Sequence, residues 1–134
     1  MIYSLYTDGG ARGNPGPGAI GVVIYDENKN KIYELSKYIG MSTNNEAEYT
    51  SLIEGIGSAL DKGIKNLNVF MDSELIIKQV NGSYKVKNER LKVFYNKLVL
   101  LRKKFDFINF VHIKREENKQ ADLLVNEALD KNGR

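Results

Sequence analysis

Three observations in the sequence predict a single α/β domain spanning residues 1–134. The length of 134 residues suits one domain with an ordinary core. Strand-type and helix-type segments follow in the order three strands, a helix, a strand, two helices, a strand and a helix. No internal repeat or linker-like stretch interrupts this order, and the 42% apolar content is typical of a soluble globular domain.

The first strand is predicted at Ile2 to Tyr6, and it leads to Asp8 at the start of a glycine-rich loop. The stretch that runs on to Gly18 holds five glycines and both prolines of the chain. Asp-Gly is a common hairpin signal, and that interpretation stays open. The loop is longer than a tight hairpin needs and carries Arg12 and Asn14, so a binding or catalytic site beside the strand end is the other interpretation.

The next segments predict two further strands, which complete an antiparallel meander. The second strand lies between Gly18 and Asp26, and the third runs from Lys31 to Ile39. A helix follows to about Lys62, and its start offers three possible N-caps, Ser42, Thr43 and Asn44.

Glu48 lies on the apolar face of that helix. It is spaced at helical intervals with Leu52 and Ile56, whereas Glu46 and Glu54 fall outside this face and are interpreted as solvated charges. A carboxylate on a core-facing stripe is costly unless it is paired, protonated or bound to a metal. An acid favoured by the helix dipole in the first turn is the alternative, and the position alone leaves both open.

Asp72 is a second acid directly after a strand. The short apolar strand is predicted at Leu67 to Met71, and a helix follows from Leu75 to Asn81. Ligands of α/β sheets bind beyond the carboxyl ends of such strands, so two strand-end acids favour a site over an N-cap role for Asp72. The remaining predicted elements are a helix from Asn88 to about Lys104, a strand from Asp106 to Ile113 and a helix from about Glu116 to Asp130, in which Asp122 borders the packed face.

Composition limits the chemistry. There is no cysteine and a single histidine, so a bound metal would need oxygen ligands. The N-terminus shows no signal peptide or membrane span, which predicts a cytoplasmic protein without membrane attachment. Eight Lys or Arg residues and one acid lie between Lys85 and Lys104, although the net charge is only +3. This segregation indicates either a basic face for a polyanion or a solvated helix face.

The motifs taken together resemble the ribonuclease H family, type 1. They are Thr7-Asp8-Gly9, the loop from Gly13 to Gly18, Thr43-Asn44-Asn45 followed by Glu48, Asp72-Ser73, and Asn118 with Ala121-Asp122. The resemblance covers nearly the whole chain. It implies a central five-stranded mixed sheet with helices on both faces. It also implies an endonuclease that hydrolyses the RNA strand of RNA–DNA hybrids, leaving 5′-phosphate and 3′-hydroxyl ends.

The resemblance further implies two Mg²⁺ ions, with Mn²⁺ as a possible substitute, held by Asp8, Glu48, Asp72 and Asp122. Asp8 would bridge the ions. Two divalent ions can activate water and stabilise both the transition state and the leaving oxygen, and Mg²⁺ prefers oxygen ligands. The implied substrate-binding residues are Gly9, Gly10, Arg12, Asn14, Thr43, Asn44, Asn45, Lys85, Lys87, Asn88 and Asn118. Amides suit the RNA 2′-hydroxyl because they both donate and accept, whereas Thr43 and the lysines suit DNA-strand phosphates.

Three positions depart from the best-known members of that family. No basic insertion follows Asn81, and Glu74 stands where glutamine is frequent. His112 has the offset from Asp122 that fits the family's catalytic histidine, but no glycine follows it before Lys119, so a structural role is the alternative.

Other functions remain open at this point. A noncatalytic nucleic-acid-binding domain of the same fold is one, and a nuclease that also cleaves double-stranded RNA is another. A phosphate-handling ATPase-like protein is disfavoured because the chain has no second glycine loop. We expect a hybrid-binding monomer without an obligate protein partner.

Overall fold

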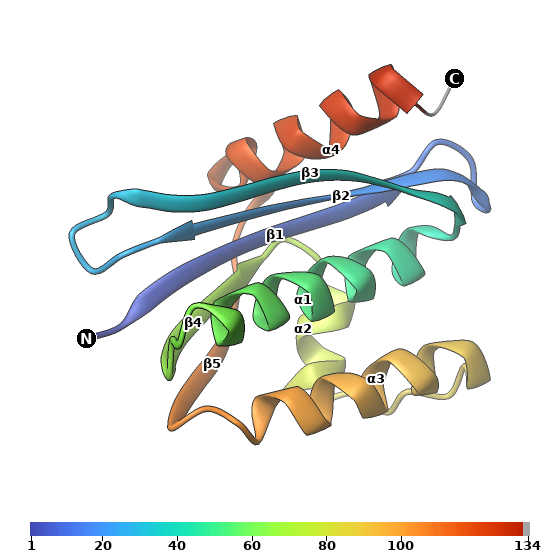
Figure 1. The fold of residues 1–134 in the computed structure, drawn as a ribbon. Coiled ribbons are helices and arrows are strands. Elements are labelled where there is room, and N and C mark those ends of the chain that lie inside the picture. Colours follow the sequence, from blue (N-terminus) through green and yellow to red (C-terminus); the bar gives the residue numbers. More distant parts are fainter. Residues whose placement is uncertain (133–134) are drawn as a thin grey trace.

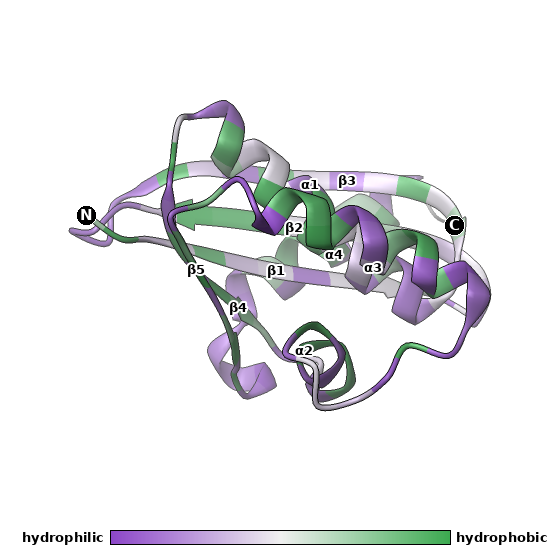
Figure 2. Cartoon of the chain, turned by 90° about the horizontal axis from the view of Figure 1, so that it is seen from below, coloured by the Kyte–Doolittle hydropathy of each residue, from purple (hydrophilic) through white to green (hydrophobic). Residues whose placement is uncertain are grey.

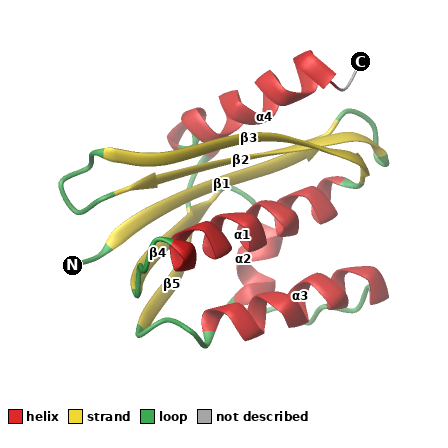
Figure 3. Cartoon of the chain, in the orientation of Figure 1, coloured by secondary structure: helices red, strands yellow, loops and turns green. Residues whose placement is uncertain are grey.

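A computed structural model describes residues 1–132, which build a five-stranded mixed sheet with helices on both faces (Figures 1 and 3). The strand order is β3-β2-β1-β4-β5. The elements are β1 Tyr3–Ala11, β2 Gly16–Tyr25, β3 Lys31–Ser42, α1 Asn44–Asp61, β4 Asn66–Met71, α2 Glu74–Val80, α3 Glu89–Arg102, β5 Phe107–His112, the 3₁₀ turn η1 Arg115–Glu117 and α4 Lys119–Asn132. The first three strands are antiparallel, while β4 and β5 are parallel to β1, so the predicted fold class is confirmed.

The course of β1 differs from the prediction. Instead of ending near Tyr6, the strand continues through Asp8 to Ala11, because its pairing with β2 extends to Ala11 and Gly18. Its pairing with β4, however, stops at Tyr6 and Phe70. Asp8 therefore lies in mid-strand, yet just beyond the point where β1 loses its parallel neighbour. The glycine-rich loop shrinks to residues 12–15.

Helix starts follow the capping chemistry of the sequence. Among the three candidate N-caps of α1, the structure uses Thr43, in a capping box with Glu46. Ser73 caps α2, so the interpretation of Asp72 as an N-cap is wrong. Asp72 is consequently free of that local role.

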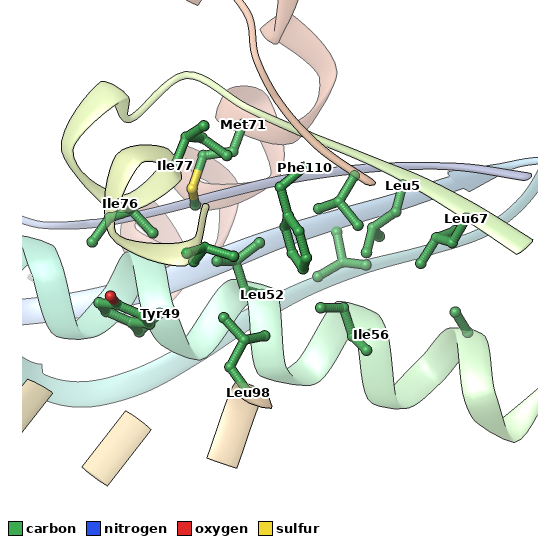
Figure 4. Close-up of a cluster of buried hydrophobic side chains, with 14 of the residues drawn as sticks. Leu5, Tyr49, Leu52, Ile56, Leu67, Met71, Ile76, Ile77, Leu98 and Phe110 are labelled. Atoms are coloured by element: carbon green, nitrogen blue, oxygen red, sulfur yellow. The ribbon is translucent and has the colours of Figure 1, made fainter. Parts of the chain in front are cut away.

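The main core lies between the sheet and α1, and α3 packs on the side of α1 away from the sheet (Figures 1 and 4). Leu52 and Ile56 of α1 meet Leu5 and Phe110 of the sheet in this layer (Figure 4). α4 covers the opposite face over β1, β2 and β3. β2 is largely hydrophobic, while the helices carry both hydrophobic and hydrophilic segments (Figure 2). No helix within residues 1–132 is both long and apolar enough to cross a membrane.

Candidate active site

Four carboxylates from four different elements line one cleft of about 350 Å³. Asp8 comes from β1, Glu48 from α1, Asp72 from the residue after β4, and Asp122 from the first turn of α4. The cleft is also lined by Gly9, Gly10, Arg12, Asn44 and Arg115. The structure thus gathers all four acids that the resemblance singled out.

Two glycines of the sheet let the acid-bearing helices approach. A Cβ on Gly9 would collide with the carbonyl group of Ala47, the residue before Glu48. A Cβ on Gly21, the cross-strand partner of Asp8, would collide with the carbonyl oxygen of Ala121, the residue before Asp122. These contacts bring both helices against the sheet beside Asp8, one on each face.

Burial and the nearby negative charges raise the pKa of two of the four acids. Burial, reinforced by the charges of Asp72, Asp122 and Glu48 and by a hydrogen bond with Asp122, raises the pKa of Asp8 to about 8. Burial also raises the pKa of Glu48 to about 7; a hydrogen bond with Ser73 opposes this shift and the charge of Asp72 adds to it. Near neutral pH the cleft therefore favours either proton uptake or a bound cation.

The donor set fits a hard divalent cation. Oxygen is the only ligand type that the four acids offer, and Mg²⁺ prefers oxygen and keeps several waters. Within residues 1–132 no three His, Asp or Glu side chains are gathered tightly enough to hold an ion by themselves. An open site, in which the carboxylates share an ion with water molecules, fits both the oxygen donors and their loose spacing.

Asn118 lies behind the cleft rather than in it. Its side-chain amide donates to the backbone oxygen of Thr7 at 2.9 Å and to Oδ2 of Asp72 at 3.5 Å. The residue is only 1% exposed, so the predicted contact of its side chain with nucleic acid does not fit this placement. Its bonds instead connect the start of α4 to β1 and orient Asp72.

Arg115 is a cleft residue that the sequence interpretation missed. Its Nη2 lies 3.6 Å from Oδ1 of Asp122, and its side chain is largely exposed. His112 is exposed at the end of β5 and is not among the residues that line the cleft. The sequence singles out Arg115 only by its charge and its place in the short segment between the last strand and Asp122.

The predicted substrate residues near the hairpin loop connect it to the start of α1. Oδ1 of Asn44 accepts from the Ala11 amide at 2.8 Å, and Oδ1 of Asn14 accepts from the Asn44 amide at 3.1 Å. Arg12, at the rim of the carboxylate cleft, pairs with Asp130 of α4 at 2.7 Å. The loop is therefore fixed on two sides.

A second cavity, of about 280 Å³, adjoins the same loop. Thr43, Asn45, Asn14 and Asn88 line it together with Glu46, Arg90 and Leu91. Glu46 is only 7% exposed, so its interpretation as a solvated charge is wrong. Lys85 and Lys87 are exposed on either side of buried Val86, in the segment before α3.

The fold and the carboxylate cleft define the class of ribonuclease H-like α/β domains, and comparisons with known proteins agree. A family model described as reverse transcriptase-like matches residues 6–128. RNase H1 of the archaeon Halobacterium salinarum superposes with a TM-score of 0.95 at 36% identity, over 98% of this chain and 99% of that chain. The chain belongs to the ribonuclease H family, type 1.

Two further relatives bear on substrate and context. LC11-RNase H1, isolated from compost, was crystallised in complex with an RNA/DNA hybrid. That structure matches with a TM-score of 0.91 and 49% identity, over 96% of this chain and 97% of that chain. A bifunctional protein of Mycobacterium tuberculosis is 40% identical over 97% of this chain, which spans only 36% of that protein's length.

Proposed function

We propose that the chain hydrolyses the RNA strand of RNA–DNA hybrids with divalent metal ions, leaving 5′-phosphate and 3′-hydroxyl ends. The observation that carries this proposal is the meeting of four carboxylates at one cleft of a ribonuclease H fold. The hybrid bound to the similar LC11-RNase H1 supports the substrate class.

Asp8, Glu48, Asp72 and Asp122 would hold the ions, Mg²⁺ or Mn²⁺. Two such ions, when bound, would activate a water molecule and stabilise the charge that develops on the leaving 3′-oxygen. Asn118 keeps Asp72 oriented through its 3.5 Å contact. Arg115 places a permanent positive charge at the cleft, where a scissile phosphate would need neutralising.

The two strands of the hybrid would be told apart by different residues. Asn44, at the catalytic cleft, and Asn45 offer amides that can donate to and accept from a 2′-hydroxyl, which only the RNA strand carries. Thr43 and Asn14 adjoin the second cavity and would grip a DNA-strand phosphate. Lys85 and Lys87 would extend that grip.

Asp8→Asn and Asp72→Asn test the assignment. Each variant should bind a labelled hybrid but fail to cleave it, because a metal ligand is lost while side-chain volume is kept. Asp61→Asn, at the exposed end of α1, is the matched control and should cleave normally. Cleavage by either test variant within tenfold of wild type in saturating Mg²⁺ would contradict the metal-site assignment.

The substrate is tested with hybrid, duplex RNA and duplex DNA in Mg²⁺, Mn²⁺ or EDTA. Metal-dependent cleavage of the RNA strand of the hybrid supports the proposal. Binding without cleavage in every metal would indicate a noncatalytic domain, and equal cleavage of duplex RNA would indicate a broader nuclease.

A further inference from the structure

The second cavity contains a buried acid where a phosphate-binding site would be expected to contain only donors. Glu46 lies beside Thr43 and Asn14, which face the same cavity of about 280 Å³. A carboxylate there would repel a phosphate unless a cation lay between them. Arg90, at the start of α3, supplies that cation.

Both oxygens of Glu46 are engaged. Oε1 accepts from the Thr43 amide at 3.1 Å, which is half of the capping box of α1. Oε2 pairs with Nε of Arg90 at 2.7 Å. The Glu46 side chain is 9% exposed and that of Arg90 is 80% exposed, so the acid is a buried anchor and the guanidinium covers it.

The guanidinium keeps donors available for a ligand. Arginine carries five N–H donors in a fixed fork, and the contact with Glu46 is made by the Nε end. The Nη groups remain at an 80% exposed side chain on the rim of the cavity. The backbone position of Arg90 is also fixed, because its amide donates to Oδ1 of Asn88 at 2.9 Å. A planar fork held in this way matches the oxygens of a phosphate.

We propose that Arg90 is a substrate-positioning residue that binds a phosphate of the DNA strand, and that Glu46 both anchors Arg90 and makes the cavity depend on it. This inference rests on the proposed function, since it assigns a contact to the hybrid. Without Arg90, the buried carboxylate would face the incoming phosphate directly.

A double-mutant cycle tests the dependence. Hybrid affinity is measured in EDTA across a salt series for wild type, Arg90→Ala, Glu46→Gln and the double variant. Glutamine can still form the capping box, so Glu46→Gln removes charge while keeping the start of α1, and thermal melts verify folding. Lys97→Ala, an exposed cation on the same helix outside the cavity, is the charge-matched control.

Arg90→Ala should weaken binding about tenfold or more, as expected for loss of a charge-assisted contact. The slope of log K against log salt should fall by about 0.9, whereas Lys97→Ala should change both much less. In the Glu46→Gln background the loss from Arg90→Ala should shrink to about threefold, because no bare carboxylate remains. Equal losses in both backgrounds, or a loss no larger than that of Lys97→Ala, would overturn the inference.

The strand is identified with hybrids that carry one uncharged methylphosphonate at a time. When the uncharged group replaces the phosphate that Arg90 binds, Arg90→Ala should cause no further loss of affinity for that hybrid, and this position should lie on the DNA strand. If the only such position lies on the RNA strand, the assignment is overturned. Turnover of the same hybrid in Mg²⁺ separates the two proposals, since Arg90→Ala should raise KM and leave kcat nearly unchanged. Wild type that binds but never cleaves would overturn the proposed function alone. Cleavage without any dependence on Arg90 would overturn this inference alone.

Discussion

Asp8→Asn should stabilise the metal-free protein at pH 8 even though it abolishes turnover. In the folded chain, burial and the charges of Asp72, Asp122 and Glu48 raise the pKa of Asp8 from 3.8 to about 8. The unfolded chain therefore releases this proton at lower pH than the folded chain does. The stability linked to the protonated carboxyl is complete below about pH 4 and is lost as the pH rises through about 8.

The size of the effect follows from that pKa difference. Each unit of pKa difference corresponds to about 1.4 kcal/mol, so deprotonation of Asp8 lowers the free energy of unfolding at pH 8 by at most about 5 kcal/mol. Asparagine removes the titration but remains a polar group in a buried place, which keeps part of the cost. We expect about 2 kcal/mol to be recovered, equivalent to a rise in Tm of roughly 6 °C for a chain of this size.

Thermal unfolding in EDTA at pH 5 and pH 8 measures this directly. The gain of Asp8→Asn over wild type should be clear at pH 8 and much smaller at pH 5, and Asp61→Asn should show none. Saturating Mg²⁺ should raise the Tm of wild type and narrow the difference, because an ion that binds only the folded state stabilises it. A Tm at pH 8 equal to or below that of wild type, or a gain independent of pH, would refute the reasoning.

Three further predictions concern Arg115 at the cleft, His112 at the end of β5, and the two lysines of the segment before α3. Arg115→Ala should lower kcat at least tenfold without lowering Tm, because a charge-assisted contact at the cleft is lost. His112→Ala should leave kcat nearly unchanged. If turnover assays instead show a loss of kcat for His112→Ala and none for Arg115→Ala, the hypothesis that His112 is catalytic is supported. Lys85→Ala combined with Lys87→Ala should raise KM and flatten the salt dependence of hybrid binding by about two units at unchanged kcat, and an unaltered slope would place the basic contact elsewhere.

The order of the elements could be predicted from local patterns in the sequence, whereas the set of four acids came from the resemblance to the ribonuclease H family. Apolar runs predicted the strands, and position alone left the roles of Glu48 and Asp72 open. The structure brings the side chains of Asp8, Glu48, Asp72 and Asp122 to one cleft. The end of β1 was misplaced because a strand can keep one neighbour after losing the other, and the pairing partner is not written in the segment itself.

The remaining errors share a physical cause, which is contact between residues far apart in the chain. Glu46 lies off the apolar stripe of α1 and is buried by Arg90 from another helix, so helical periodicity could not reveal it. Asn118 matched a motif, but only the packing of α4 against β1 shows that its side chain points into the protein. That Arg115 lines the cleft and His112 does not likewise depends on the course of the chain after β5, and the role of His112 stays a prediction.

The contacts of Gly9 in β1 and Gly21 in β2 set how far apart the sheet holds α1 and α4. α1 rests on one face at Gly9 and α4 on the opposite face at Gly21, so the gap between Glu48 and Asp122 includes the thickness of a single layer of backbone. Expansion of the core beneath α1 would move Glu48 while leaving the seat of Asp122 undisturbed. Glu48 and Asp122 are therefore supported by separate helix contacts, and the absence of a Cβ at Gly9 and Gly21 is what lets both helices come this close to the sheet.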